Sequence, residues 1–386
     1  MKKATLKLTT LVMLLGTAAV SNAQTSGNVK INTVTTAVPF LRISPDARSA
    51  GMGDVGIATA PDAYSGFWNI AKTPFSTKTS SIGVTYTPWL SDLNLKDVYL
   101  ASAAGYYKLD ESQALSMGLR YFSLGNIEFT DASGSSLGSN RPREFAIDFG
   151  YSRKLSDKSG IGIALRYISS DLAGNTPING VTYKKGTSVA GDLHYFNNGL
   201  KENGEGLTWG ITLSNLGSKI SYSSNANQKD YIPANIGVGA AYTKVFDADN
   251  KMTFALDLNK LLVPTPPFQG ETETDSSFGV RLNGYRSKGV VSSWVSSFGD
   301  AEKGGELKEI TASIGAEYSY KEQFSFRAGY FYENPNKGNR KYFTVGAGLK
   351  YNTFGLNFAY LVPSGTGVGR NPLSNTLRFS IIFDVE

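Results

Sequence analysis

The sequence of 386 residues contains no cysteine. Disulfides and thiolate metal sites are therefore excluded, so stability must come from packing and backbone pairing. There is a single histidine, His194, and a lone imidazole without thiolates cannot form an ordinary zinc site. After residue 23 no run of 18 or more apolar residues occurs, which excludes a membrane-spanning helix. We expect neither a metal ion nor a cofactor.

Excess charge is also scarce. The 38 basic and 32 acidic residues give a formal charge of +6 at pH 7. Three of the lysines (Lys2, Lys3 and Lys7) lie in a segment that we expect to be removed, which leaves a charge of about +3, too small and dispersed to indicate nucleic-acid binding.

Residues 1–23 have the pattern of a secretory signal peptide. Lys2 and Lys3 precede a mostly apolar stretch, and Ser21-Asn22-Ala23 places small residues at the usual cleavage positions. We expect export and a mature chain that begins near Gln24. Because no cysteine follows the cleavage site, no acyl anchor is expected.

Glycine and aromatic residues are abundant. Glycine accounts for 42 residues, above the usual share of about 7%, and Tyr and Phe supply 21 each. From about Ser80 onward, apolar residues occupy every second position, as in 161–167, 207–213, 252–258 and 377–383. This period of two is typical of β-strands with one apolar face.

The opposite face of these strands carries charge. A soluble sandwich turns its charged face to water, whereas a transmembrane barrel turns it inward to a polar lumen. Aromatic clusters near strand ends fit the girdles of a barrel. The residues concerned are Arg120, Asp148, Arg166, Asp257, Glu317, Arg327 and Arg378, of which we predict Arg166, Asp257, Glu317, Arg327 and Arg378 as lumen charges.

Connection lengths support the barrel. About fourteen candidate strands are joined by connections that alternate between short and long, as in transmembrane barrels. The long ones span roughly 125–142, 171–187, 217–231, 263–305, 333–340 and 362–374. We therefore predict an all-β, 14-stranded antiparallel transmembrane barrel over 80–386, in which the last strand pairs with the first near Ser81–Trp89.

Two segments do not fit the strand pattern. Residues 24–79 are rich in Ala, Gly, Pro and Asp, and we predict an N-terminal hatch there. In the loop 263–305, three prolines interrupt any strand, and Gly289–Gly299 is compatible with a short amphipathic helix around Trp294.

Gly51-Met-Gly-Asp-Val-Gly56 matches the dinucleotide-binding pattern G-x-G-x-x-G. That site requires a strand before the glycines, a helix after them, and an acidic residue about 20 positions on. Pro45 interrupts the upstream segment, Pro61 the downstream one, and no acid lies at 71–76. We interpret the glycines as small residues that allow close packing inside the lumen.

Gly134-Ser-Ser-Leu-Gly138 matches G-x-S-x-G, the pattern of a nucleophile elbow. The elbow requires a strand-turn-helix context and a histidine partner. Ser136 instead lies in a Gly/Ser-rich loop, and the one histidine is His194 in a candidate strand. We do not predict an enzyme. An outer-membrane hydrolase with Ser136 as nucleophile and His194 as base is the third alternative, after the two given below.

The stretch 47–75, with Ala47-Arg-Ser-Ala-Gly-Met-Gly-Asp54 and then Asp62 and Trp68-Asn69, followed by fourteen amphipathic strands, resembles the PorV family. These proteins are outer-membrane subunits of the type IX secretion system and are similar in fold to FadL long-chain fatty-acid transporters. The resemblance covers essentially the whole mature chain. FadL-like hatches usually carry Asn-Pro-Ala where this chain has Asn69-Ile70-Ala71.

The resemblance implies an outer-membrane protein-transport component with several partners. These are a giant translocon barrel of the SprA or Sov type, the C-terminal signal domains of exported cargo, a sortase-like attachment complex of the PorU type, and outer-membrane lipid. The runner-up is a FadL-like transporter of hydrophobic small molecules, which requires an apolar lumen pocket.

The topology suggests which residues do this work. Hatch residues would pair with lumen charges such as Arg166 or Arg327 and seal the pore, and loop aromatics would contact the translocon and cargo or pack on their own loop and the lipid headgroups. The predicted hatch set is Arg48, Gly51, Met52, Gly53, Asp54, Asp62, Trp68 and Asn69, and the predicted contact set is Pro266, Phe268, Trp294 and Phe298.

Overall fold

The computed structural model describes residues 32–90, 95–130, 133–174, 177–178, 181–223, 229–270, 272–300, 305–362 and 375–386. The predicted signal peptide at 1–23 and the predicted loop at 362–374, apart from Val362, lie outside these residues.

Within the described residues, fourteen strands close into one antiparallel barrel, which confirms the predicted fold. The barrel strands are β1 (Ser80–Pro88), β2 (Val98–Lys108), β3 (Gln113–Leu124), β6 (Arg143–Lys154), β7 (Ser159–Asp171), β10 (Gly186–Leu200), β11 (Gly206–Gly217), β12 (Asn235–Val245), β13 (Asn250–Leu261), β14 (Thr311–Tyr320), β15 (Phe324–Tyr332), β16 (Lys341–Tyr351), β17 (Phe354–Val362) and β18 (Leu377–Val385).

The barrel closes where its first strand meets its last. β1 pairs with β18 from Ser80↔Val385 to Tyr86↔Phe379, as the alternation predicts. Closure pairs the backbone polar groups of both edge strands, which is a requirement for β-structure in lipid.

The barrel wall is apolar outside and polar inside. In β1, Ile82 and Val84 are more than half exposed, whereas the alternating Ser81 and Thr85 are buried. The same inversion holds in β7, where Leu165 is exposed and Arg166 is buried. This is the pattern of a wall that faces lipid, so the protein is an outer-membrane β-barrel.

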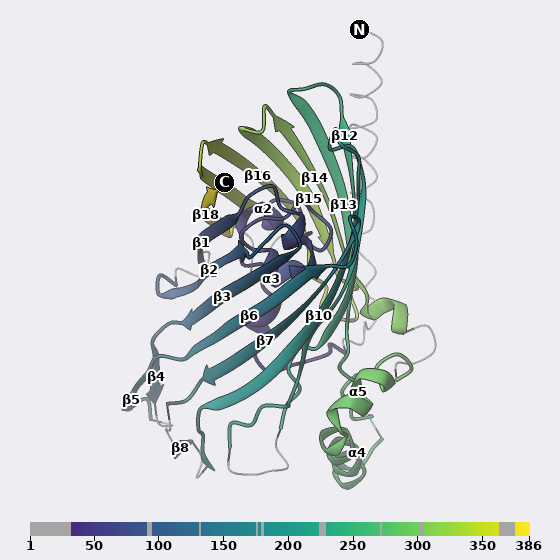
Figure 1. The fold of residues 1–386 in the computed structure, drawn as a ribbon. Coiled ribbons are helices and arrows are strands. Elements are labelled where there is room, and N and C mark those ends of the chain that lie inside the picture. Colours follow the sequence, from purple (N-terminus) through teal and green to yellow (C-terminus); the bar gives the residue numbers. More distant parts are fainter. Residues whose placement is uncertain are drawn as a thin grey trace, which may run out of the picture. The chain divides into compact units, whose positions relative to one another are not determined.

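Connections of different length separate the two ends of the barrel. Tight turns at 109–112, 155–158, 246–249, 321–323 and 352–353 lie at one end, which by the usual rule is the periplasmic end. The other end carries the long loops, including the hairpins β4 (Ile127–Thr130) with β5 (Ser136–Asn140) and β8 (Pro177–Ile178) with β9 (Val181–Thr182). Figure 1 shows β4, β5, β8, α4 and α5 at this long-loop end.

The described residues of the connection between β13 and β14 include three helical elements. These are α4 (Asp275–Ser287), α5 (Val290–Ser296) and the 3-10 turn η4 (Glu306–Glu309). α5 lies where a short helix around Trp294 was expected, whereas α4 was not predicted. In the described residues, no helix is both long and apolar enough to cross a membrane.

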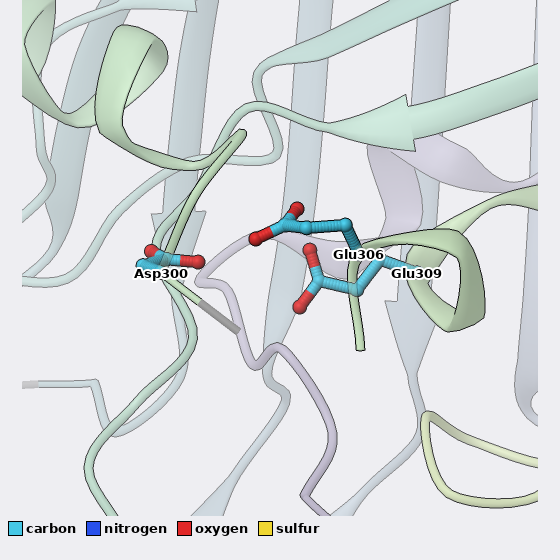
Figure 2. A group of neighbouring side chains, drawn as sticks. All are labelled: Asp300, Glu306 and Glu309. Atoms are coloured by element: carbon cyan, nitrogen blue, oxygen red, sulfur yellow. The ribbon is translucent and has the colours of Figure 1, made fainter. Parts of the chain in front are cut away.

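An acidic cluster joins the end of this loop to the barrel. Figure 2 shows Asp300, Glu306 and Glu309, which each place one carboxylate oxygen within 4.8 Å of the other two. Lys260 of β13 pairs with both glutamates, and Lys337 Nζ lies 2.8 Å from Glu309 Oε1. Burial alone would raise the pKa of Glu309, but hydrogen bonds from these lysines and Thr265 lower it. Two ammonium groups therefore already balance two of the three carboxylates.

Candidate functional site

The described part of the N-terminal segment, residues 32–79, lies inside the ring of strands (Figure 1). We call these residues the hatch. Its helical turns are short: η1 (Pro39–Arg42), α2 (Ala47–Ala50), α3 (Ser65–Trp68) and η2 (Ile70–Phe75). All eight residues of the predicted hatch set lie here, and each is buried or half-buried.

Side-chain caps fix these turns. The Asp46 carboxylate accepts a hydrogen bond from the Ser49 amide at 2.7 Å, which begins α2, and another from Trp68 Nε1 at 2.8 Å. Burial, together with the nearby Asp62 carboxylate, raises the pKa of Asp46 against the effect of these donors. Asn69 begins η2, because its Oδ1 accepts from the Ala71 amide at 3.1 Å.

Glycines of the hatch face glycines of the wall. A Cβ added at Gly53 would lie 2.6 Å from the Tyr330 nitrogen, and one added at Gly329 would lie 2.0 Å from the Met52 carbonyl carbon. Gly53 also has a φ of +73°, which favours glycine, and a Cβ at Gly56 would lie 2.1 Å from the Trp68 ring. A Cβ at Gly51 would lie 3.0 Å from the Gly346 Cα, so all three glycines of the G-x-G-x-x-G match serve close packing of backbone and rings.

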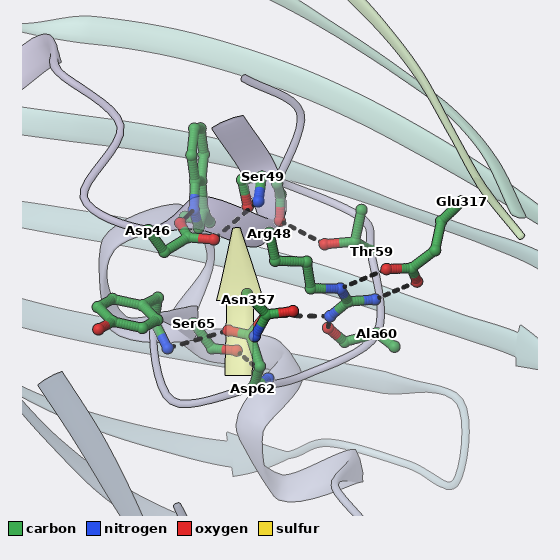
Figure 3. A network of polar contacts seen from close by, with 12 residues as sticks. Asp46, Arg48, Ser49, Thr59, Ala60, Asp62, Ser65, Glu317 and Asn357 are labelled. Atoms are coloured by element: carbon green, nitrogen blue, oxygen red, sulfur yellow. Dashed lines mark hydrogen bonds and ion pairs between the residues drawn. The ribbon is translucent and has the colours of Figure 1, made fainter. Parts of the chain in front are cut away.

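Arg48 links the hatch to the wall (Figure 3). Its Nε and Nη2 donate to the two carboxylate oxygens of Glu317 in β14 at 3.1 and 2.9 Å, and its Nη1 donates to Asp62 at 3.0 Å. Burial alone would lower the pKa of Arg48, but the Glu317 and Asp62 charges outweigh it and raise the pKa. Arg327 of β15 donates to the same Glu317 at 2.6 Å. Two cations and two anions therefore form one buried, balanced network.

Two further carboxylates connect hatch and wall. Asp54 of the hatch accepts from the Tyr342 hydroxyl at 2.6 Å and from Arg378 Nη1 at 3.3 Å. In the opposite sense, Asp257 of β13 accepts from the hatch amides of Gly56 at 2.7 Å and Ile57 at 3.0 Å. Each contact satisfies a polar group that would otherwise be buried without a partner.

Hydrogen bonds also attach the hatch to β10. Asn69 Nδ2 donates to the Tyr195 carbonyl at 3.0 Å, and the Ile70 amide donates to Nδ1 of His194 at 2.8 Å. The buried position of His194 and this bond assign the only histidine of the sequence a structural contact with the hatch. Ser136 of the G-x-S-x-G match is exposed in the β4–β5 hairpin, so the structure does not bring the two together.

Lys72 is a buried cation within the hatch. Its side chain is fully buried, and its Nζ donates to the Gly56 carbonyl at 2.6 Å and to Thr59 Oγ1 at 3.3 Å. Burial lowers the pKa of Lys72 to about 8, although the Asp62 charge opposes the shift. Sequence reasoning missed this residue, because nothing in its neighbourhood along the chain marks it as buried.

The predicted lumen charges all point inward, but they do not all reach the hatch. Arg166 pairs with Asp148 and Asp192 of neighbouring strands, and it also donates to Asn215. Arg166 thus pairs within the wall, whereas Arg327 shares Glu317 with Arg48 of the hatch. The physical reason is register, since Asp148 lies directly opposite Arg166 in the β6–β7 pair.

Two cavities that border the hatch are small. The one between α3 and strands β2, β3 and β6, lined among others by Tyr64, Phe67 and Ser102, has a volume of about 20 Å³. A second, lined by Arg42, Asn259 and other residues, is of the same size. Such volumes hold about one water molecule.

The predicted contact residues lie in the loop between β13 and β14. Phe268 and Phe298 are about half exposed, at 49% and 54%, whereas Pro266 and Trp294 are partly buried. Lys260 Nζ lies 5.7 Å from the Phe298 ring centroid. Of the four predicted contact residues, the structure thus places Phe268 and Phe298 on the surface of the long-loop end.

Comparison with protein families gives a match over residues 26–268 to the model described as "Type IX secretion system protein PorV". No curated protein sequence matches the chain.

Solved structures resemble the whole barrel. The Ralstonia pickettii toluene transporter TbuX has a TM-score of 0.53 at 11% identity, covering 88% of this chain and 98% of that one. The CymD monoaromatic hydrocarbon channel has a TM-score of 0.52 at 13% identity, covering 92% and 98%. A Pseudomonas aeruginosa FadL homologue covers 88% and 98% at 11% identity with a TM-score of 0.46. At these identities the likeness concerns the fold alone.

Proposed function

The chain belongs to the PorV family of type IX secretion system proteins, and we propose that within this system it binds the translocon barrel and the C-terminal signal domains of exported cargo. The translocon partner is a giant barrel of the SprA or Sov type. The cargo then passes to a sortase-like attachment complex of the PorU type at the cell surface. Residues 1–23 are the signal peptide and 24–79 the hatch in this proposal, and no catalytic step belongs to it.

The observation that carries this proposal is the anchored hatch. Its contacts reach β14 through Arg48, β16 and β18 through Asp54, β13 through Gly56, and β10 through Ile70. A lumen filled and bonded on so many sides favours a role at the surface of the barrel over conduction through it. The working surface is then the long-loop end.

The loop between β13 and β14 supplies the contact surface in this proposal. Phe268 and Phe298 are exposed aromatic side chains, and Leu307 in η4 is 77% exposed. Exposed aromatic and aliphatic groups of this kind are typical of protein interfaces. The acidic cluster with Lys260 and Lys337 holds the C-terminal end of the loop against the barrel rim.

The test is purification of the tagged protein from its own outer membrane in mild detergent, with quantification of every chain that copurifies. We expect a very large barrel and cargo with C-terminal signal domains. The double substitution Phe268→Ser with Phe298→Ser should reduce their recovery at least about fivefold, as loss of interface anchors does. The control Ile127→Ser removes a 44%-exposed apolar side chain from the β4–β5 hairpin at the same end and should leave recovery unchanged.

Recovery of a lone barrel with bound lipid would contradict the proposal and favour transport of hydrophobic small molecules. That alternative requires a passage for the substrate, whereas the cavities beside α3 and beside Arg42 have volumes of about 20 Å³. Passage would require the hatch to break its bonds to the wall.

A further inference from the structure

A cationic hollow lies at the long-loop end, between the α4–α5 junction and the segment that follows β11. Its volume is about 770 Å³. Four of its lining residues are basic and none is acidic. The lining consists of Ser218, Lys219, Lys229, Asn283, Gly284, Arg286, Ser287, Lys288, Gly289 and Val290.

Internal contacts hold the wall of this hollow in place. Lys219 Nζ donates to the carbonyl oxygens of Arg286 and Lys288 at 2.7 and 2.8 Å, so it ties the end of α4 to the end of β11. The same ammonium lies 3.9 Å from the centroid of the Tyr231 ring. Tyr231 packs edge-on against Tyr285 of α4 and donates its hydroxyl to the Tyr285 carbonyl at 3.1 Å. These contacts therefore fix the relative positions of the end of α4 and the end of β11, which form the walls of the hollow.

The positive charge of the hollow is not balanced locally. Lys229, Arg286 and Lys288 form no ion pair with any residue in the described part of the chain. In the sequence, residues 224–228 (Ser-Asn-Ala-Asn-Gln) carry no charge. Asp230 follows Lys229 along the chain, but it does not line the hollow. Cations gathered without counter-charges attract an anionic ligand, and a guanidinium with nearby ammonium groups suits phosphate.

The surroundings indicate an amphiphilic anion. Val290 lines the hollow, and Val291 and Val295, which lie on one face of α5, are 67% and 73% exposed. Ser218 and Lys219 follow directly after the end of β11, on the side of the barrel that faces out of the cell. A free phosphate ion would use the cations but not the apolar face, and an acidic peptide would not need that face either.

We propose that this hollow binds the phosphate-bearing headgroup of a glycolipid in the outer leaflet. The phosphates contact Lys229, Arg286 and Lys288, and the apolar face of α5 contacts the start of the acyl chains. Neither Phe268 nor Phe298 lines the hollow, so the proposal does not depend on the translocon and cargo role.

The test uses the mature protein in nanodiscs of zwitterionic phospholipid and titrates bis-phosphorylated lipid A. Lys229→Gln with Lys288→Gln should weaken binding about tenfold, because two charge-assisted contacts are lost. Lys229→Arg with Lys288→Arg should retain binding, which also shows that the double Gln variant has not simply lost its fold. The matched control, Lys184→Gln with Lys308→Gln, removes two exposed lysines from the same end and should change binding less than about twofold.

Four further results would overturn the proposal. If the test pair and the control pair weakened lipid A binding equally, the binding would depend on the general charge of the surface and not on a specific site. Competition by inorganic phosphate at the same concentration as lipid A, or equally tight binding of dephosphorylated lipid A, would reject the glycolipid phosphate as the ligand. Binding of an octaglutamate peptide to the hollow, with no binding of lipid A, would assign the hollow to an acidic protein segment.

Discussion

Arg48 in the hatch and Glu317 in β14 form a bidentate ion pair although their positions in the sequence differ by 269. Both side chains are largely buried, and Glu317 also accepts from Arg327. Removal of one member of a buried ion pair leaves a charge without a partner in a medium of low dielectric constant. The pair therefore makes the hatch and the wall depend on each other.

Glu317→Gln should destabilise the protein strongly. Among the described residues, the substitution leaves Arg48 with Asp62 alone and Arg327 without an ion-pair partner, and breaking a buried pair costs about 3–5 kcal/mol. Denaturant unfolding of the refolded barrel measures the change. Glu322→Gln is the matched control, because Glu322 pairs with the exposed Lys251 in a turn, and it should cost less than about 1 kcal/mol. Equal effects of the two substitutions would contradict the role given to Glu317.

Gly329→Ala should displace the hatch. Its Cβ would lie 2.0 Å from the Met52 carbonyl carbon, a distance that backbone atoms cannot tolerate. We expect overpacking to cost about 1–3 kcal/mol or more and the conductance in planar bilayers to rise as the hatch loosens. Gly355→Ala serves as the control, since its Cβ would meet Ile382 at an ordinary 3.6 Å. An unchanged conductance in Gly329→Ala would show that the hatch does not depend on this contact.

The buried side chain of Lys72 should make the free energy of unfolding depend on pH. Burial lowers its folded-state pKa to about 8, below the unfolded value of 10.5, so between these values the unfolded chain binds the extra proton. Stability should therefore rise as the pH increases from about 8 to 10.5, and it should not change from this source below pH 8. The difference in unfolding free energy between wild type and Lys72→Met, followed from pH 7 to 10, isolates the effect. A difference that is constant over this range would contradict the prediction.

His194 should be replaceable by a side chain that can accept the same hydrogen bond. His194→Leu leaves the buried Ile70 amide without an acceptor, which costs about 1–3 kcal/mol, whereas the Oδ1 of His194→Asn can take the place of Nδ1. Hydrogen exchange of the Ile70 amide should accelerate in the Leu variant and change little in the Asn variant. Slow exchange in both variants would show that the bond is unimportant.

The barrel itself could be predicted from the sequence because its signals are local. Alternation within segments such as 207–213 fixes strands and faces, and the order of short and long connections fixes their ends. The pairing of the last strand with the first follows from the need to remove exposed edges.

Other features depend on information that is not local. α4 escaped prediction because Gly279 and Gly284 lower its helix propensity and only three apolar residues, Phe278, Leu282 and Tyr285, share one face. The partners of Arg166 and Arg48 are decided by strand register and by the path of the hatch, neither of which can be read from spacing along the chain. The roles of Lys72 and His194 likewise depend on burial by segments distant in sequence.

The absence of cysteine allows a direct test of whether the lumen must open. Ala47 of the hatch donates its amide to Ser380 of β18 at 2.9 Å, so Ala47→Cys with Ser380→Cys provides a pair for a disulfide between the hatch and the wall. The measurement is export of native cargo by cells that carry this variant, oxidised and then reduced, with cross-linking quantified by mass spectrometry. If the protein acts through its outer loops, export continues at the wild-type rate with the hatch locked. Export that stops on oxidation and recovers on reduction would show that the hatch must move, and would contradict the proposed function.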